Sequence, residues 1–91
     1  MLNSIYIKNF AIIDELFVEF DKGLNIITGE TGSGKTLLVK AIQLILGKRF
    51  SREMLKSGKD SIILEGIFNY KDKDIIIRRI YKNNKSRTFI D

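Results

Sequence analysis

Residues 29–36 read GETGSGKT, the residue types and spacing of a phosphate-binding (Walker A) loop. Its glycines let the backbone curl so that successive N–H groups point inward, and the N-terminus of a following helix adds partial positive charge. A cradle of this kind suits the phosphate chain of a nucleotide. Nucleotide binding is therefore the first prediction from this sequence.

Each position of this phosphate loop has an expected role. The Lys35 ammonium reaches the β- and γ-phosphates, and the Thr36 hydroxyl joins the shell of a Mg²⁺ that bridges the same two groups. Glu30, Thr31 and Ser33 contribute mainly backbone donors. With Thr36 as the magnesium ligand, the predicted binding set is Gly29, Glu30, Thr31, Gly32, Ser33, Gly34, Lys35 and Thr36.

The alternative is a chance match in a glycine-rich turn, because the motif fixes only four positions. The context favours the phosphate loop. An apolar, strand-like run at residues 24–28 leads into it, and a helix-like run at residues 37–46 follows. The polar residues of this helix form one narrow stripe, so we expect it to be buried on most sides, between a sheet and another layer. Gly47 is its expected C-terminal cap.

The remaining segments predict an α/β fold with one strand–loop–helix unit and an antiparallel β meander. Residues 1–50 form the expected nucleotide-binding unit and residues 61–91 the meander. Expected strands are residues 4–8, 16–20, 62–68, 74–81 and 87–90, with polar turns at 21–23, 71–73 and 83–85 and a linker at 49–59 holding one helical turn near 53–55.

This architecture looks incomplete. A phosphate-loop domain normally contains several strand–helix units around a parallel sheet, whereas this chain has one. A chain of this size buries only about 60–65% of its unfolded surface, and its apolar helix would leave one flank exposed. We therefore expect further sequence or a partner to complete the domain.

Composition excludes several kinds of site. The chain has no cysteine and no histidine, so disulfides, thiolate metal sites and an imidazole base are excluded, and any metal is held by oxygen. It shows no long uncharged apolar run and no secretory leader, which predicts a cytoplasmic protein without a membrane segment.

The formal net charge of +5 leaves two interpretations open. Basic residues are scattered with acids between them, which favours solvated strands and turns. The other interpretation is a DNA-contacting face, which requires the basic side chains to lie on one side of the sheet. Its candidates are Arg78, Arg79, Lys82, Lys85 and Arg87.

Hydrolysis needs a carboxylate on the magnesium shell and a group that orients water. Asp14 and Glu15 follow an apolar run, but phosphate-loop ATPases place that strand after the loop, so we interpret the pair as solvated turn acids. Glu65 interrupts an apolar run without a neighbouring acid, which indicates a strand-surface role. We identify no catalytic residue in this chain.

Two stretches resemble the start of the RecN family of bacterial DNA repair ATPases. They are IYIKNFAIID at residues 5–14 and FDKGLNIITGETGSGK at residues 20–35. The resemblance continues with AI at 41–42, LGKR at 46–49, KSGKD at 56–60, IRR at 77–79 and SRTFI at 86–90, and so covers essentially the whole chain.

That family belongs to the ABC ATPases of the structural-maintenance-of-chromosomes (SMC) type, whose heads combine the two ends of one polypeptide joined by a coiled coil. The resemblance implies the N-terminal, ATP-binding lobe of such a head in DNA double-strand-break repair, with ATP and Mg²⁺ on residues 29–36 and Lys8-Asn9-Phe10 near the nucleotide edge. The implied partners are the C-terminal lobe of the same head, a second head in a homodimer, and DNA through the full-length protein.

The chain departs from that family by omission. It has no coiled-coil heptads, no Leu-Ser-Gly-Gly signature motif and no later strand carrying a metal-binding Asp and a catalytic Glu. We expect this chain alone to bind nucleotide weakly, with negligible hydrolysis. Two other classes stay open: another phosphate-loop ATPase or kinase-like domain, and a basic nucleic-acid-binding module whose loop binds backbone phosphate.

Overall fold

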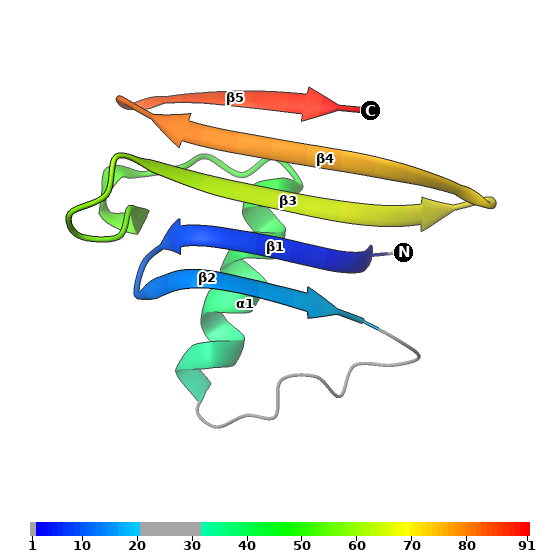
Figure 1. Ribbon diagram of the computed structural model, residues 1–91, viewed down its shortest axis with the longest axis horizontal. Helices are drawn as coiled ribbons and strands as arrows, with labels where there is room; N and C mark the ends of the chain where they lie inside the picture. Colours follow the sequence, from blue (N-terminus) through cyan, green and yellow to red (C-terminus); the bar gives the residue numbers. More distant parts are fainter. Residues whose placement is uncertain (1, 21–31) are drawn as a thin grey trace.

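The computed structural model describes residues 2–20 and 32–91 (Figure 1). Within them, five strands form one antiparallel sheet in the order β2-β1-β3-β4-β5, and a helix crosses one face of it. The elements are β1 (Leu2–Phe10), β2 (Ile13–Glu19), α1 (Gly32–Ile45), a 3-10 turn η1 (Arg52–Met54), β3 (Ser61–Tyr70), β4 (Lys73–Lys82) and β5 (Lys85–Ile90).

The β3-β4-β5 meander lies where the sequence predicts it. Two short polar turns separate its three strands. The turns are Lys71-Asp72 and Asn83-Asn84, and all four residues have positive φ. Two consecutive residues of this kind make a turn whose twist matches that of a two-stranded ribbon. The predicted strand at 24–28 and turn at 21–23 lie outside the described residues.

Strand alternation divides the sheet into two faces. Pairing of Ile5 with Val18 and Ile7 with Leu64 places these apolar side chains on the face that α1 covers. The opposite face carries a row that crosses all five strands. Its members are Phe17, Tyr6, Glu65, Arg78 and Phe89, in that order across the sheet.

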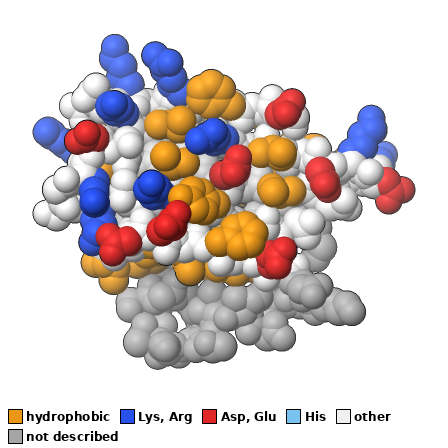
Figure 2. Space-filling model, viewed as in Figure 1, with side chains coloured by type: hydrophobic (Ala, Val, Ile, Leu, Met, Phe, Trp, Pro, Cys, Tyr) orange, Lys and Arg blue, Asp and Glu red, His pale blue; other side chains and the backbone are white. Residues whose placement is uncertain are grey.

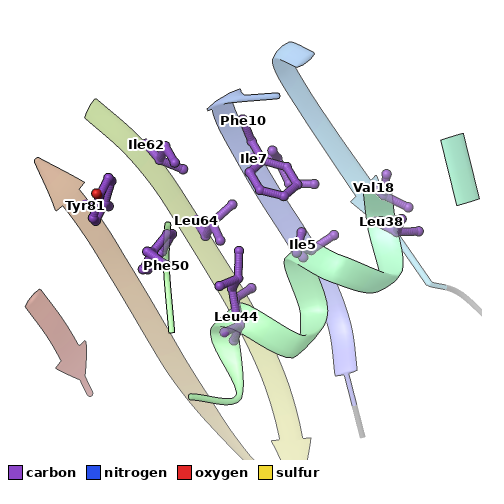
Figure 3. Close-up of a cluster of buried hydrophobic side chains, with 12 residues drawn as sticks. Ile5, Ile7, Phe10, Val18, Leu38, Leu44, Phe50, Ile62, Leu64 and Tyr81 are labelled. Atoms are coloured by element: carbon purple, nitrogen blue, oxygen red, sulfur yellow. The ribbon is translucent and has the colours of Figure 1, made fainter. Parts of the chain in front are cut away.

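The core lies between α1 and the sheet (Figure 3). Leu38, Ala41 and Leu44 of the helix are buried in the same cluster as Ile5 and Ile7 of β1. Burying each of the leucines and isoleucines among them stabilises the fold by about 1.5–3 kcal/mol. The core therefore fixes how α1 lies across the strands.

The outer side of α1 has no second layer within the described residues. Val39 of α1 is 52% exposed, and Leu46, the residue directly after the helix, is 65% exposed, so apolar side chains remain in water on this side. Residues 2–20 and 32–91 therefore do not provide the second layer that was expected to cover α1 on the side away from the sheet. The same residues contain no helix that is long and apolar enough to cross a membrane.

Candidate nucleotide-binding site

Helix α1 begins inside the predicted phosphate loop, at Gly32. Gly29, Glu30 and Thr31 lie outside the described residues, whereas Gly32, Ser33, Gly34 and Lys35 contribute their backbone to the first turn of the helix. The first four N–H groups of a helix have no acceptor within it, and the helix dipole is positive at this end. The first turn also carries no acidic side chain. This end of α1 can therefore accept an anion.

Thr36, the predicted magnesium ligand, is exposed at the start of the second turn of α1. A hydroxyl oxygen is a suitable ligand for a hard cation such as Mg²⁺, which otherwise keeps water and phosphate oxygens in its shell. Elsewhere in the described chain, no three Asp, Glu, His or Cys side chains gather into a metal site. The role of Thr36 as a magnesium ligand stays a prediction.

The C-terminal end of α1 is closed by the expected glycine. Gly47 has φ +115° and its N–H donates to the Leu44 carbonyl at 3.0 Å, while the Lys48 N–H donates to Gln43 at 3.1 Å. These two bonds form a Schellman cap, in which a left-handed glycine turns the chain away from the helix. The predicted cap at Gly47 is confirmed.

A buried arginine also binds this end of the helix. Nη1 of Arg79, on β4, donates to the carbonyls of Leu44 at 2.5 Å and Lys48 at 2.8 Å. Its other nitrogens donate to Thr88 and Ser86 on β5, at 3.1 and 3.4 Å. The side chain is only 7% exposed, so Arg79 is not available as a DNA contact, contrary to one interpretation of the sequence.

Arg79 stays positively charged although it is buried. Desolvation lowers the pKa of its guanidinium, but an arginine starts so far above neutrality that it remains protonated. The guanidinium lies 4.8 Å from the ring centroid of Phe50, which in turn stacks on Tyr81 at 5.1 Å. A cation over an aromatic face is stabilised by the ring quadrupole. Sequence reasoning missed this cluster.

The segment Lys8-Asn9-Phe10 lies at the end of β1, away from the sheet edge. Phe10 is 1% exposed and belongs to the core, so its ring is unavailable to a ligand. The Asn9 side chain donates to the Ser61 carbonyl at 3.2 Å, and its own carbonyl accepts the Lys56 N–H at 3.0 Å. Lys8 is exposed. A position near the nucleotide stays a prediction, for Lys8 and Asn9 only.

The two acids weighed as a catalytic pair are engaged elsewhere. Asp14 and Glu15 are exposed residues of β2, so their interpretation as turn acids was wrong. Glu15 accepts a 2.6 Å hydrogen bond from the Tyr6 hydroxyl, and Asp14 pairs with Lys56 at 3.5 Å. Because consecutive residues of a strand point to opposite faces of the sheet, these two carboxylates do not face one common site. That the chain holds no catalytic residue stays a prediction.

Glu65 lies on β3, on the face opposite α1, between Tyr6 and Arg78 in the strand register. It is half-buried there, as a side chain standing on a sheet surface is. Arg78 on β4 is exposed, and opposite charges on neighbouring strands attract. The structure therefore agrees with a strand-surface role for this glutamate.

The remaining basic candidates share one face of the β4–β5 hairpin. The register pairs Lys82 with Lys85 and Ile80 with Arg87, which places both lysines, Arg87 and Arg78 opposite α1. Figure 2 shows this face, with Lys and Arg side chains gathered toward the end where β4 stops and β5 starts. Acidic side chains lie on the same face, mostly farther from that end.

Comparison with known proteins identifies relatives for nearly all of the chain. A family model described as "AAA domain" matches residues 4–91. The DNA repair protein RecN of Bacillus subtilis is 50% identical over 68 residues, which cover 75% of this chain and 12% of that protein. RecN of Rickettsia bellii is 41% identical over 92 residues, covering 100% of this chain and 16% of the relative. The chain thus spans a small part of these relatives, matching their N-terminal part.

Two solved structures share the fold. The SMC head domain from Thermotoga maritima superposes with a TM-score of 0.76 at 21% identity, over 99% of this chain and 36% of that one. The recombination mediator protein RecF, in a structure with ATP, gives a TM-score of 0.75 at 24% identity, over 99% and 26%. The predicted fold, an incomplete N-terminal lobe of an SMC-like ATPase head, is confirmed.

Proposed function

This chain belongs to the AAA domain family, and we propose that it is the ATP-binding lobe of a DNA double-strand-break repair ATPase. One observation carries the proposal. The GETGSGKT motif runs into the first turn of α1, the helix that crosses the sheet of a lobe shared with SMC and RecF heads. The motif alone or the fold alone would support the assignment of ATP binding less specifically than the two together do.

ATP is the nucleotide that these observations favour. The similar RecF structure is one of RecF with ATP, and the superposition covers 99% of the present chain. In our proposal, Lys35 neutralises the β- and γ-phosphates and backbone N–H groups of residues 29–36 surround them. Mg²⁺, held by the Thr36 hydroxyl, supplies further neutralisation when it is bound. The chain thus holds the nucleotide in place for chemistry.

The rest of the head completes this lobe in our proposal. The surface on which a C-terminal lobe packs is the outer side of α1, where Val39 is exposed, together with Leu46 directly after the helix. Covering these two aliphatic side chains would remove apolar surface from water. The relatives are also six to eight times longer than the part that the chain covers. Packing on this surface would join the loop to the catalytic residues that the chain lacks.

A second head engages across the nucleotide in the same proposal. Half a site binds phosphate but does not orient an attacking water, so the chain binds ATP and requires the other lobe and a second head for turnover. Nucleotide binding then favours head–head engagement, since a nucleotide shared by two heads binds the engaged state more tightly. This assigns the chain a switching role in the full-length protein.

DNA is the proposed partner of the full-length protein, and the β4–β5 hairpin is the surface that this chain offers to it. Lys82, Lys85 and Arg87 are exposed on one face, and Arg78 lies nearby on the same face. Lysine and arginine bind DNA mainly through its phosphates, without reading sequence. Attachment at this surface is expected to be weak and sensitive to salt.

The proposal is tested by measuring binding and turnover side by side. We expect Mg-ATP to bind the chain in an equilibrium titration while phosphate release stays at the level of a blank. The Lys35→Ala variant should lose most of the binding, and Lys40→Ala, which changes an exposed lysine beyond the loop on the same helix, should keep it. Equal binding by all three proteins would refute the assignment of the loop. Rapid phosphate release abolished by Lys35→Ala would refute the half-site.

A further inference from the structure

Arg79 connects three elements at the end of α1 that is remote from the phosphate loop. It lies on β4, its Nη1 donates to the Leu44 and Lys48 carbonyls, and its Nε donates to the Thr88 hydroxyl on β5 at 3.1 Å. Four hydrogen bonds use most of the donors of a guanidinium. The helix end is therefore attached to the sheet by a side chain with little freedom to move.

The position of this cation matches the electrostatics of the helix. The last turn of a helix exposes carbonyl oxygens and carries partial negative charge, and α1 has no basic residue in its own last turn. Arg79 supplies that charge from the neighbouring strand. It does so at 7% exposure, where hydrogen bonds to a charged group are stronger than at the surface.

The opposite end of the same helix is the candidate site. An α-helix of 14 residues is a rod of about 20 Å, so a change in how its C-terminal end is held alters the direction of its N-terminal end. The first turn, from Gly32, supplies backbone donors whose value depends on where they point. The sheet thus influences the phosphate loop through the direction of this helix.

We propose that Arg79 is a positioning residue for nucleotide binding, which acts by fixing the C-terminal end of α1 on the β4–β5 hairpin. This inference rests on the proposed function, because it assumes that the loop at the start of α1 binds ATP. Arg79 touches no nucleotide in this account. Its effect passes through the helix, and by linkage nucleotide binding must also tighten the hydrogen bonds at the helix end.

The test compares Arg79→Met and Arg79→Lys with the unchanged chain in Mg-ATP titrations. Methionine keeps the apolar stem and removes every donor, so we expect its dissociation constant to rise about fivefold or more, the lower end of typical couplings between distant sites. Lysine keeps the charge but has no planar fork of donors, so the dissociation constant of Arg79→Lys should lie between those of the unchanged chain and Arg79→Met. Ile62→Ala, a core change on β3, serves as a control that destabilises the sheet and removes none of the hydrogen bonds that Arg79 makes to the helix end.

A second readout separates positioning from loss of stability. In the unchanged chain, Mg-ATP should slow hydrogen exchange of the Gly47 and Lys48 amides, which donate within the cap. Arg79→Met should lose this slowing while Ile62→Ala keeps it. Equal ATP affinity in Arg79→Met and the unchanged chain would overturn the inference, as would an equal loss of affinity in Ile62→Ala.

If Arg79→Met does not fold, Arg79→Lys decides the question: an unchanged dissociation constant for Mg-ATP in that variant overturns a positioning role for Arg79. Failure of the proposed function has a different signature. If Lys35→Ala binds Mg-ATP as tightly as the unchanged chain, the loop is not the site, and the inference falls with it.

Discussion

Gly66 of β3 lies directly beneath Ile45 of α1, so close that a β-carbon on this glycine would stand 3.2 Å from Cδ1 of the isoleucine. A larger residue fits there only if the Ile45 and Phe68 side chains shift by a few tenths of an ångström, so this glycine allows α1 to pack close to the sheet. The same β-carbon would also meet the Phe68 ring at 3.2 Å. The contact is tight from two sides.

Gly66→Val should therefore destabilise the protein by about 1–3 kcal/mol, the usual cost of overpacking a core. The free energy of unfolding from urea titration measures it. Ile67→Val, on the other face of the same strand, is the matched control and should cost less, because it removes a methyl group from a half-buried side chain. A valine at position 66 that leaves stability unchanged would contradict the close packing.

Ala11 adopts φ 56° in the two-residue turn between β1 and β2. This left-handed conformation costs an L-residue with a β-carbon about 1–2 kcal/mol relative to the right-handed one, whereas glycine adopts both. The Ala11 N–H donates to the Met54 carbonyl at 2.6 Å, a bond that glycine would keep. We expect Ala11→Gly to raise the thermal midpoint.

The control for this prediction is Asn84→Gly. Asn84 also has positive φ, 63°, but asparagine tolerates that region better than alanine, and its side chain accepts a 3.2 Å hydrogen bond from the Tyr81 hydroxyl that glycine would lose, so any gain should be smaller. A decrease in stability on Ala11→Gly, as seen for glycine in an ordinary loop, would show that the turn is not strained.

Tyr6 should titrate at higher pH than an ordinary tyrosine. Its hydrogen bond to Glu15 and the nearby negative charge raise the pKa of the phenol, because both favour the neutral form. A raised folded-state pKa means that this contribution to stability is present below the unfolded value, near pH 10, and is lost as pH rises through the folded value.

Tyrosinate absorbance during alkaline titration tests this. Subtracting the curve of Tyr6→Phe isolates Tyr6 from the other two tyrosines. Glu15→Gln should move the difference curve to lower pH, toward the ordinary value, because the carboxylate is gone. An unmoved curve would mean that the pair does not form in solution.

The basic hairpin predicts a salt-dependent affinity for DNA. Replacing Lys82 and Lys85 by glutamine should reduce the slope of log affinity against log salt by about 2, if each lysine contacts one phosphate. Lys71 and Lys73, at the opposite end of β4, are the matched control pair and should leave the slope unchanged. Equal effects of both pairs would indicate non-specific attraction to a basic protein.

The strands and the helix follow from local signals. Alternating apolar residues and polar turns located β3, β4 and β5 to within two residues, since Lys71-Asp72 and Asn83-Asn84 are residue types that turns of this kind accept. The helix was expected because a long apolar run follows a glycine-rich loop. These patterns require no knowledge of distant contacts.

The β1–β2 turn was missed for the opposite reason. Its central residues are Ala11 and Ile12, and neither is a type that favours turns. The sequence therefore predicted the turn at the nearby acids Asp14 and Glu15. The actual turn is supported by a distant segment, through the bond from the Ala11 N–H to Met54. Tertiary contact overrides local preference there.

Arg79 could not be assigned from sequence because two consecutive arginines on a strand must point to opposite faces. Which one turns inward depends on where the end of α1 rests, and that is a contact across 35 positions of the chain. Strand parity does not decide between them, because Ile77, Arg79 and Tyr81 share one face while Ile76, Arg78 and Ile80, which are at least as apolar, share the other.

The most direct test of the account follows the backbone amide signals of the chain by NMR while Mg-ATP is added. The account predicts that the largest shifts belong to residues 29–36, with a smaller response at Gly47 and Lys48, and that Lys35→Ala suppresses both. Shifts concentrated on the β4–β5 hairpin, or their absence at saturating nucleotide, would contradict the claim that this lobe binds ATP at the start of α1.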